Sequence, residues 1–185
     1  MLLLEKFLAY YCSPAMAGIK PSNLVTCFKD KLPNAKESIA LLNKKLNKRD
    51  IYIDILCECP ARLLLIVYRK GQLLKQLHDP AISDFLKTYG YDPNGSLKDY
   101  FRVLKARLQE DQFPHEIGAF LGYPLEDIHG FIRTKGREYL CVGDWKVYGD
   151  VEHAQRLFCQ YKTCRNTILS RVKNGQSLAE IFRAA

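Results

Sequence analysis

The stretch FPHEIGAFLGYPLEDIHGFI, residues 113–132, constrains the fold of this 185-residue chain more than any other stretch. Its apolar residues recur at helical spacing on both sides of a short Gly-Tyr-Pro break. Gly122 suits the left-handed conformation that ends a helix, and Pro124 suits the restart of the chain as a helix. The sequence therefore predicts two short helices that are joined by a tight turn and share one buried seam.

The same segment, over residues 113–135, also fits the helix-turn-helix pattern of DNA-binding proteins, with a small residue at Gly118 and a turn glycine at Gly122. A recognition helix enters the major groove by its N-terminal end. Here that end carries Glu126 and Asp127, two carboxylates that phosphates and base edges repel. A structural helix pair and a DNA-reading segment both stay open, and the acidic end favours the structural pair.

The rest of the chain predicts an α+β fold, a small mostly antiparallel sheet of two hairpins with helices packed against it. The segment IYIDILCECPARLLLIVYRK predicts a first hairpin with arms at residues 51–59 and 62–68. The segment REYLCVGDWKVYGD predicts a second hairpin, with Gly143-Asp144 as a two-residue turn. Residues 24–28 predict one more short strand. No linker or low-complexity segment interrupts the chain, so we expect a single domain over residues 1–185.

Apolar periodicity predicts helices over residues 2–11, 34–47, 72–78, 81–89 and 96–109, and a long helix after residue 150. Ser96 and Asp150 are the expected N-caps, and Ser177 with Glu180 forms a capping box for a last short helix. Residues 12–23, CSPAMAGIKPSN, are expected to form a loop, because their prolines and glycine oppose a continued helix.

Composition and net charge indicate the cellular compartment of the protein and the kinds of partner that it binds. The opening MLLLEKFLAYYC has too short an apolar run for a signal peptide or a membrane span. Seven cysteines at irregular spacing fit free thiols in a reducing compartment better than a disulfide framework. We therefore expect a cytoplasmic protein with no membrane partner. The net charge of +8 indicates either an anionic partner or a solvated basic surface, because the charge is spread over many segments.

Four strings in the chain carry a family resemblance: FPHEIGAFLGYPLEDIHGFI, CVGDWKVYGD, an Ala-Gln-Arg-Leu-Phe helix, and AGIKPSNL near the start. Together they resemble the bacterial domain-of-unknown-function family three-seven-nine-three. The resemblance covers nearly the whole chain and implies one compact bacterial domain. It implies no reaction, cofactor or catalytic residue. Many members look to have a tyrosine where this chain has Asp144.

The loop near the start of the chain is one candidate site. Lys20, Ser22 and Asn23 bring together a cation, a hydroxyl and an amide that can hold an anion or a phosphate. Alternatively, Ser22 and Asn23 bond the local backbone as turn residues do. Cys12 in the same loop is a candidate nucleophile, although no base for it is identifiable in the sequence.

A second candidate site lies around the helix pair and the second hairpin. His115 and Glu116 are adjacent at a helix start, so their side chains diverge by about 100° and form no pair with each other. His115 is a candidate acid, base or ligand, or a structural hydrogen-bonding group. Lys146 and Tyr148 share one face of the hairpin and can contact an anion, whereas Trp145 faces the core.

No metal site is expected, because the sequence has no Cys-x-x-Cys and no second histidine four residues after His115. Cys57 and Cys59 are expected on one strand face with Ile53 and Ile55, as small hydrophobic residues of the core.

The first hypothesis is a cytoplasmic domain that binds an anionic small molecule or a protein partner through groups that converge in space. The residues of this predicted site are Lys20, Ser22, Asn23, His115, Glu116, Tyr123, Lys146 and Tyr148. The alternatives are nucleic-acid binding through residues 113–135 and a thiol-dependent enzyme that uses Cys12. No reaction and no cofactor follow from the sequence.

Overall fold

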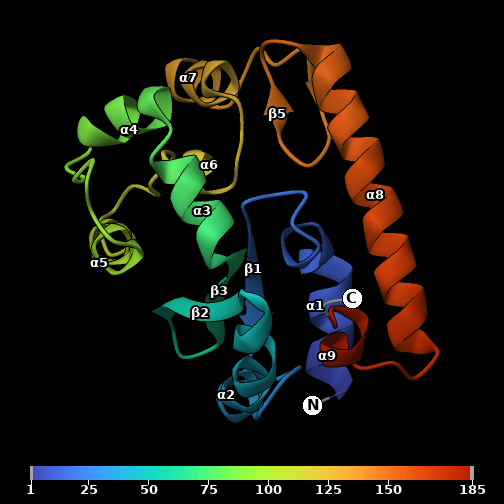
Figure 1. Ribbon diagram of the computed structural model, residues 1–185. Helices are drawn as coiled ribbons and strands as arrows, with labels where there is room; N and C mark the ends of the chain where they lie inside the picture. Colours follow the sequence, from blue (N-terminus) through green and yellow to red (C-terminus); the bar gives the residue numbers. More distant parts are fainter. Residues whose placement is uncertain (1, 184–185) are drawn as a thin grey trace. The chain divides into compact units, whose positions relative to one another are not determined.

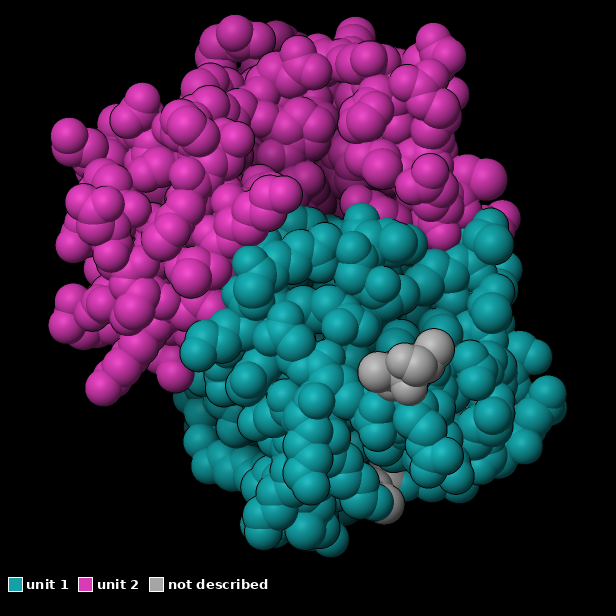
Figure 2. Space-filling model, viewed as in Figure 1, with its two compact units in different colours: residues 1–73, 163–185 teal, residues 74–162 magenta. Residues whose placement is uncertain are grey.

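The computed structural model describes residues 2–183, which form two compact units. Unit 1 contains the described part of Met1–Leu73 and Thr163–Ala185, and unit 2 contains Leu74–Lys162 (Figure 2). Along the chain, helices α3 (Lys70–Leu77) and α8 (Val151–Lys173) run from one unit into the other. Each unit is described by itself below.

Unit 1 is built on a three-stranded antiparallel sheet in the order β1-β3-β2 (Figure 1). Its strands are β1 (Ser22–Phe28), β2 (Ile51–Glu58) and β3 (Arg62–Arg69). The first hairpin that the sequence predicts is therefore confirmed, and its second arm is the central strand. β1 joins the other side of this arm, where Val25 pairs with Leu65.

Two helices pack on this sheet, α1 (Leu2–Met16) on β1 and β3, and α2 (Ala35–Leu46) on β2. A short 3-10 helix, η1 (Asn47–Arg49), leads from α2 into β2. The end of α8 and the short helix α9 (Leu178–Ile181), which starts at the predicted capping box of Ser177 and Glu180, complete the core. This core includes Leu8, Leu42, Leu65, Val67, Ile168, Val172 and Leu178.

Helix α1 continues through Pro14 to Met16, so the prediction of a loop that begins at residue 12 is wrong for residues 12–16. Proline removes one backbone donor from a helix, and here the last turn is supported in other ways. Pro14 is buried in unit 1, the Ser13 hydroxyl donates to the Ala9 carbonyl, and the N–H of Ala15 donates to Asn23 Oδ1 at 3.0 Å. Tertiary contacts thus outweigh the local preference.

A register shift in β2 between Ile55 and Cys57 changes which side chains face the core. Ile53 is buried on the core side, but Leu56, the residue at the shift, is also buried, and Cys57 is only half-buried. The prediction that Cys57 and Cys59 continue the face of Ile53 is therefore wrong, because a bulge interrupts the two-residue alternation of the strand.

Unit 2 is mainly helical. Its elements are α4 (Pro80–Lys87), α5 (Leu97–Arg107), α6 (Ile117–Phe120), α7 (Leu125–Thr134), the strands β4 (Cys141–Val142) and β5 (Lys146–Val147), and the first part of α8. The predicted N-caps are confirmed: Ser96 forms a capping box with Asp99, and Asp150 Oδ1 accepts from the N–H of His153 at 2.9 Å. The second hairpin is also confirmed, but its turn spans three residues, because Val142 pairs with Lys146.

The helices and the two antiparallel sheets confirm the predicted α+β class, with one hairpin in each unit. Within residues 2–183, no helix is both long enough and apolar enough to cross a membrane.

Glu5 is an unusual member of the unit 1 core, because it is a carboxylate that is only 3% exposed. Its Oε1 has no hydrogen-bond partner among residues 2–183. Burial raises the pKa of the Glu5 carboxyl above its ordinary value, and the charge of Lys45 opposes this only in part. The folded state therefore holds the Glu5 proton more tightly than the unfolded chain does, so its ionisation destabilises the fold as the pH rises.

We expect Glu5→Gln to raise the free energy of unfolding near neutral pH by about 1 kcal/mol, because an amide carries no charge to desolvate. The difference should shrink as the pH falls below the ordinary carboxyl pKa, where wild-type Glu5 is protonated in both states. Urea unfolding at neutral and at acidic pH measures it. Glu37→Gln, at an exposed position of α2, is the control and should change stability by only a few tenths of a kcal/mol. A Glu5→Gln protein that is less stable than wild type at neutral pH would contradict this account.

Candidate functional site

Unit 2 is organised around Asp127, a carboxylate in the first turn of α7 that is 3% exposed. Its Oδ2 accepts from Trp145 Nε1 at 2.6 Å, and its Oδ1 accepts from the N–H groups of Tyr148 at 2.6 Å and Gly149 at 3.0 Å. Hydrogen bonds to an ionised acceptor are stronger than neutral ones, and an anion is favoured at a helix N-terminus. Asp127 therefore fastens the second hairpin to the start of α7.

The neighbouring Glu126 also joins α7 to the chain after the second hairpin. Its Oε1 accepts from the N–H of Asp150, just before α8, at 3.1 Å. The contacts show that the chain from Trp145 to Asp150 lies against the end of α7 that a DNA-reading helix would insert, and α6 is a single turn of four residues.

Glycines in the two family strings permit close packing. A Cβ atom at Gly130 of α7 would overlap the ring of Tyr148, and a Cβ atom at Gly143 would overlap the ring of Phe158. Gly122 differs from these, since its φ of 70° gives the left-handed helix end that the sequence predicts. The glycines at positions 130 and 143 of the family strings are thus explained by close contacts between the backbone and aromatic rings.

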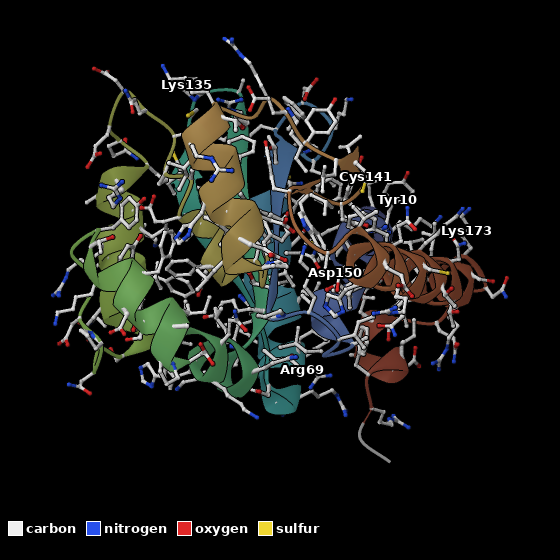
Figure 3. The ribbon with its side chains drawn as sticks, turned by 90° about the horizontal axis from the view of Figure 1, so that it is seen from above. Tyr10, Arg69, Lys135, Cys141, Asp150 and Lys173 are labelled. Carbon is white, nitrogen blue, oxygen red and sulfur yellow. The ribbon has the colours of Figure 1, made fainter. Side chains whose placement is uncertain are left out.

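The structure brings two predicted site residues, His115 and Lys146, onto the same ring of α7. The ring centroids of His115 and Phe131 are 4.9 Å apart, and Lys146 Nζ lies 5.8 Å from the Phe131 centroid. Lys146 Nζ also lies 4.9 Å from the Tyr139 centroid and donates to the Gly136 carbonyl at 2.6 Å. Its charge is thus engaged by rings and a carbonyl of its own unit. Gly136, which supplies the carbonyl, follows Lys135, the C-cap of α7 that Figure 3 labels.

The other predicted residues of unit 2 make internal contacts. Tyr148 packs on Gly130, and its hydroxyl lies 3.4 Å from Thr134 Oγ1. The Tyr123 ring stacks on Trp145 at a centroid distance of 4.9 Å, and burial raises the pKa of its hydroxyl.

Glu116 is 1% exposed and forms an ion pair with Arg107. Its Oε1 also accepts from the Tyr91 hydroxyl at 3.4 Å. This carboxylate therefore faces the interior of unit 2, while the adjacent His115 is exposed, as their predicted divergence requires.

Lys20, Ser22 and Asn23 belong to unit 1, and all three are buried. Lys20 lies in the turn between α1 and β1, and Ser22 and Asn23 begin β1. Arg69, labelled in Figure 3, holds the start of this turn by donating from Nε to the Met16 carbonyl at 2.9 Å. Asn23 accepts from the α1 backbone, which is the turn role that the sequence left open for it. The residues of the predicted site are divided between the two units, so neither unit contains all of them.

Cys12 lies in α1 and has no exposed surface. Burial raises the pKa of its thiol, and the positive charge of Lys20 opposes this only in part. A nucleophilic cysteine must ionise to a thiolate and be accessible to solvent. The burial of Cys12 disfavours the thiolate and prevents access.

A hollow of about 500 Å³ opens between α4 and α7 of unit 2, a size typical of small-molecule sites. It is lined by Ala81, Phe85, Thr88, Tyr89, Leu125, His129, Ile132 and Arg133. These positions recur every three or four residues, so each helix presents one face to the hollow.

Three of the lining side chains carry polar groups that the protein does not use. Within residues 2–183, the Tyr89 hydroxyl, the His129 ring nitrogens and the Arg133 guanidinium have no hydrogen bond or ion pair. Their rings are in contact through Phe85, whose centroid lies 5.2 Å from that of Tyr89 and 5.1 Å from that of His129. The hollow thus offers a cation, aromatic rings and hydrogen-bonding groups to a ligand.

None of the hollow residues was in the predicted site. The available signal was the spacing of four between His129 and Arg133, which places both on one face of α7. The pairing of that face with α4 was not readable from the sequence. Among residues 2–183, no group of three or more His, Cys, Asp or Glu side chains is placed to hold a metal ion.

We expect Asp127→Asn to lower the free energy of unfolding by about 3 kcal/mol, because an amide brings its own donors to a site where three donors already point inward. Urea unfolding followed by the fluorescence of Trp145, the only tryptophan, measures the loss. Asp111→Asn, at an exposed position before α6, is the matched control and should be near neutral. Equal stability of the two variants would contradict the role of Asp127.

We expect Gly130→Ala to cost about 1 to 3 kcal/mol, because the new methyl group overlaps the Tyr148 ring. In a Tyr148→Gly background, which removes both the ring and the Cβ that the new methyl group would meet, the same change should be neutral or stabilising by up to about 1 kcal/mol, since alanine favours a helix over glycine. A double-mutant cycle on unfolding free energies gives the coupling. Costs that simply add would show that the two residues do not pack as described.

The chain matches the model of a family described as "Protein of unknown function (DUF3793)" over residues 8–182. No curated protein and no solved structure matches it. The match includes both long strings, whose residues build the contacts between α7 and the second hairpin. The family resemblance of the sequence is thereby confirmed, and the chain belongs to DUF3793.

Proposed function

We propose that this protein binds a small anionic molecule, and that unit 2 holds it in the hollow between α4 and α7. One observation carries the proposal: three unengaged polar side chains, Tyr89, His129 and Arg133, converge on one hollow of about 500 Å³. Ligand sites are typically apolar hollows with a few such convergent polar groups. An unpaired arginine is suited to a carboxylate or phosphate, because its planar fork donates two parallel hydrogen bonds.

The charge of the hollow favours an anion. Its lining contains Arg133 and His129 and no Asp or Glu. The whole chain carries a net charge of +8, so the long-range field also attracts anions. A cationic ligand would find no carboxylate among the lining residues.

The predicted site residues have a different part in this proposal. Lys20, Ser22, Asn23, Glu116, Tyr123 and Tyr148 are buried or packed against their own units, which supports positioning roles for them. The cluster of His115, Phe131, Tyr139 and Lys146, of which His115 and Tyr139 are exposed and the other two half-buried, is the surface of unit 2 on which a protein partner would find aromatic rings and a cation.

Two alternatives have less support. Nucleic-acid binding through residues 113–135 is opposed by the hairpin that lies against the start of α7. A thiol-dependent reaction at Cys12 is opposed by the complete burial of the thiol. We place the protein in the bacterial cytoplasm, and its seven free cysteines support a reducing compartment.

Native mass spectrometry of the protein mixed with a small-molecule extract of cytoplasm tests the proposal. We expect wild type to gain the mass of a small acid, and Arg133→Gln to bind it at least about tenfold more weakly, because a charge-assisted hydrogen bond pair is lost. Arg137→Gln, which makes the same charge change at an exposed position outside the hollow, is the matched control and should keep the ligand.

Equal mass gains in all three proteins would exclude the hollow as the site. No mass gain in wild type would contradict binding itself. Retention of wild type on a phosphate polymer that falls as the salt concentration rises would favour the nucleic-acid alternative.

A further inference from the structure

The aromatic rings of the hollow indicate what the acidic group is attached to. We infer that the ligand is a planar aromatic molecule that carries a carboxylate or a phosphate, an inference that rests on the proposed function. The ring binds against Phe85, Tyr89 and His129, and the acidic group binds to Arg133.

The three rings of the hollow do not stack on one another. Phe85 is tilted by 62° to Tyr89 and by 56° to His129. In a tilted pair the edge of one ring meets the face of the other, so faces stay uncovered that a stacked pair would cover. A further ring that enters the hollow gains offset or edge-to-face contacts of about 0.5 to 1.5 kcal/mol each beyond the burial of its area.

Tyr89 is held in place from within unit 2. The Arg107 guanidinium lies 5.2 Å from the Tyr89 ring centroid, and Arg107 is in turn held by the buried Glu116. This chain fixes the ring and leaves the Tyr89 hydroxyl unengaged, so less side-chain entropy is lost when a ligand binds. Glu116, a residue of the predicted site, thereby acquires a function as a positioning residue for the hollow.

Arg133 lies four residues after His129, so the two side chains are neighbours on α7, with about 5 to 6 Å between their Cβ atoms. That separation suits a ring beside His129 and an acidic substituent at Arg133. Ala81, Leu125 and Ile132 supply apolar surface around the ring. A bare inorganic anion would use Arg133 and leave these contacts unmade.

Matched probes separate the ring from the acidic group. The probes are phenyl phosphate with cyclohexyl phosphate, benzoate with cyclohexanecarboxylate, and inorganic phosphate alone. Shifts of the His129 ring resonances on titration give the dissociation constants. We expect each aromatic acid to bind at least about fivefold more tightly than its saturated counterpart, since the two differ in the aromatic contacts. Comparison of phenyl phosphate with benzoate tells which acidic group the hollow prefers.

Variants test the two halves of the site separately. Phe85→Leu should remove the preference for aromatic over saturated acids, and Arg133→Gln should weaken all the acids. Phe113→Leu is the control, because Phe113 is an exposed phenylalanine of the same unit that does not line the hollow. A circular dichroism spectrum equal to that of wild type shows that a variant is folded. If Phe85→Leu does not fold, Arg133→Gln, at an exposed position, still tests the binding of the acidic group, and the matched probes on wild type still test the ring.

The outcomes distinguish this inference from the proposed function. If saturated and aromatic acids bind equally and Arg133→Gln weakens both, the hollow is an anion site and the inference of a ring is wrong. If none of the probes binds wild type, or all bind Arg133→Gln as tightly as wild type, both the inference and the proposed function are wrong.

Discussion

Unit 2 depends on the carboxylate of Asp127. A buried carboxylate without partners costs several kcal/mol, and Asp127 avoids this cost only when Trp145, Tyr148 and Gly149 supply their N–H groups. The start of α7 and the second hairpin therefore form together. Trp145 extends the effect, because its ring lies 4.6 Å, centroid to centroid, from that of Phe158 in α8. One acidic side chain thus couples a helix, a hairpin and the first part of α8.

The family strings are explained largely by this architecture. The string around residue 127 supplies the acceptors, the string around residue 145 supplies the donors, and Gly130 and Gly143 allow the rings of Tyr148 and Phe158 to come close. Glu116 also has a structural role, because its carboxylate is paired with Arg107 and accepts from Tyr91 in the interior of unit 2. A residue pattern this specific identifies the fold of the unit without identifying a ligand.

The sequence predicted those features that local chemistry decides. The first hairpin, the N-cap at Ser96 and the cap at Asp150 depend on neighbours within a few residues, and all are confirmed. The wrong predictions came where distant contacts decide. Pro14 stays helical in a buried turn that Asn23 supports, and a bulge turns Cys57 away from the core. A single sequence gives no sign of a bulge or of a partner from another element.

The same limit explains why the sequence predicted Glu116 as a site residue and none of the residues that line the hollow. A polar residue in a specific pattern attracts a functional interpretation, yet a group that already has buried partners has little left to offer a ligand. Tyr89 stands in the turn after α4 and Arg133 in the amphipathic helix α7, far apart in the sequence. The two residues gain significance only because α4 and α7 face each other across an open hollow in which these polar groups are unpaired. In this protein the distinction between engaged and unengaged polar groups separates the residues that build unit 2 from those available to bind, and only tertiary structure makes that distinction.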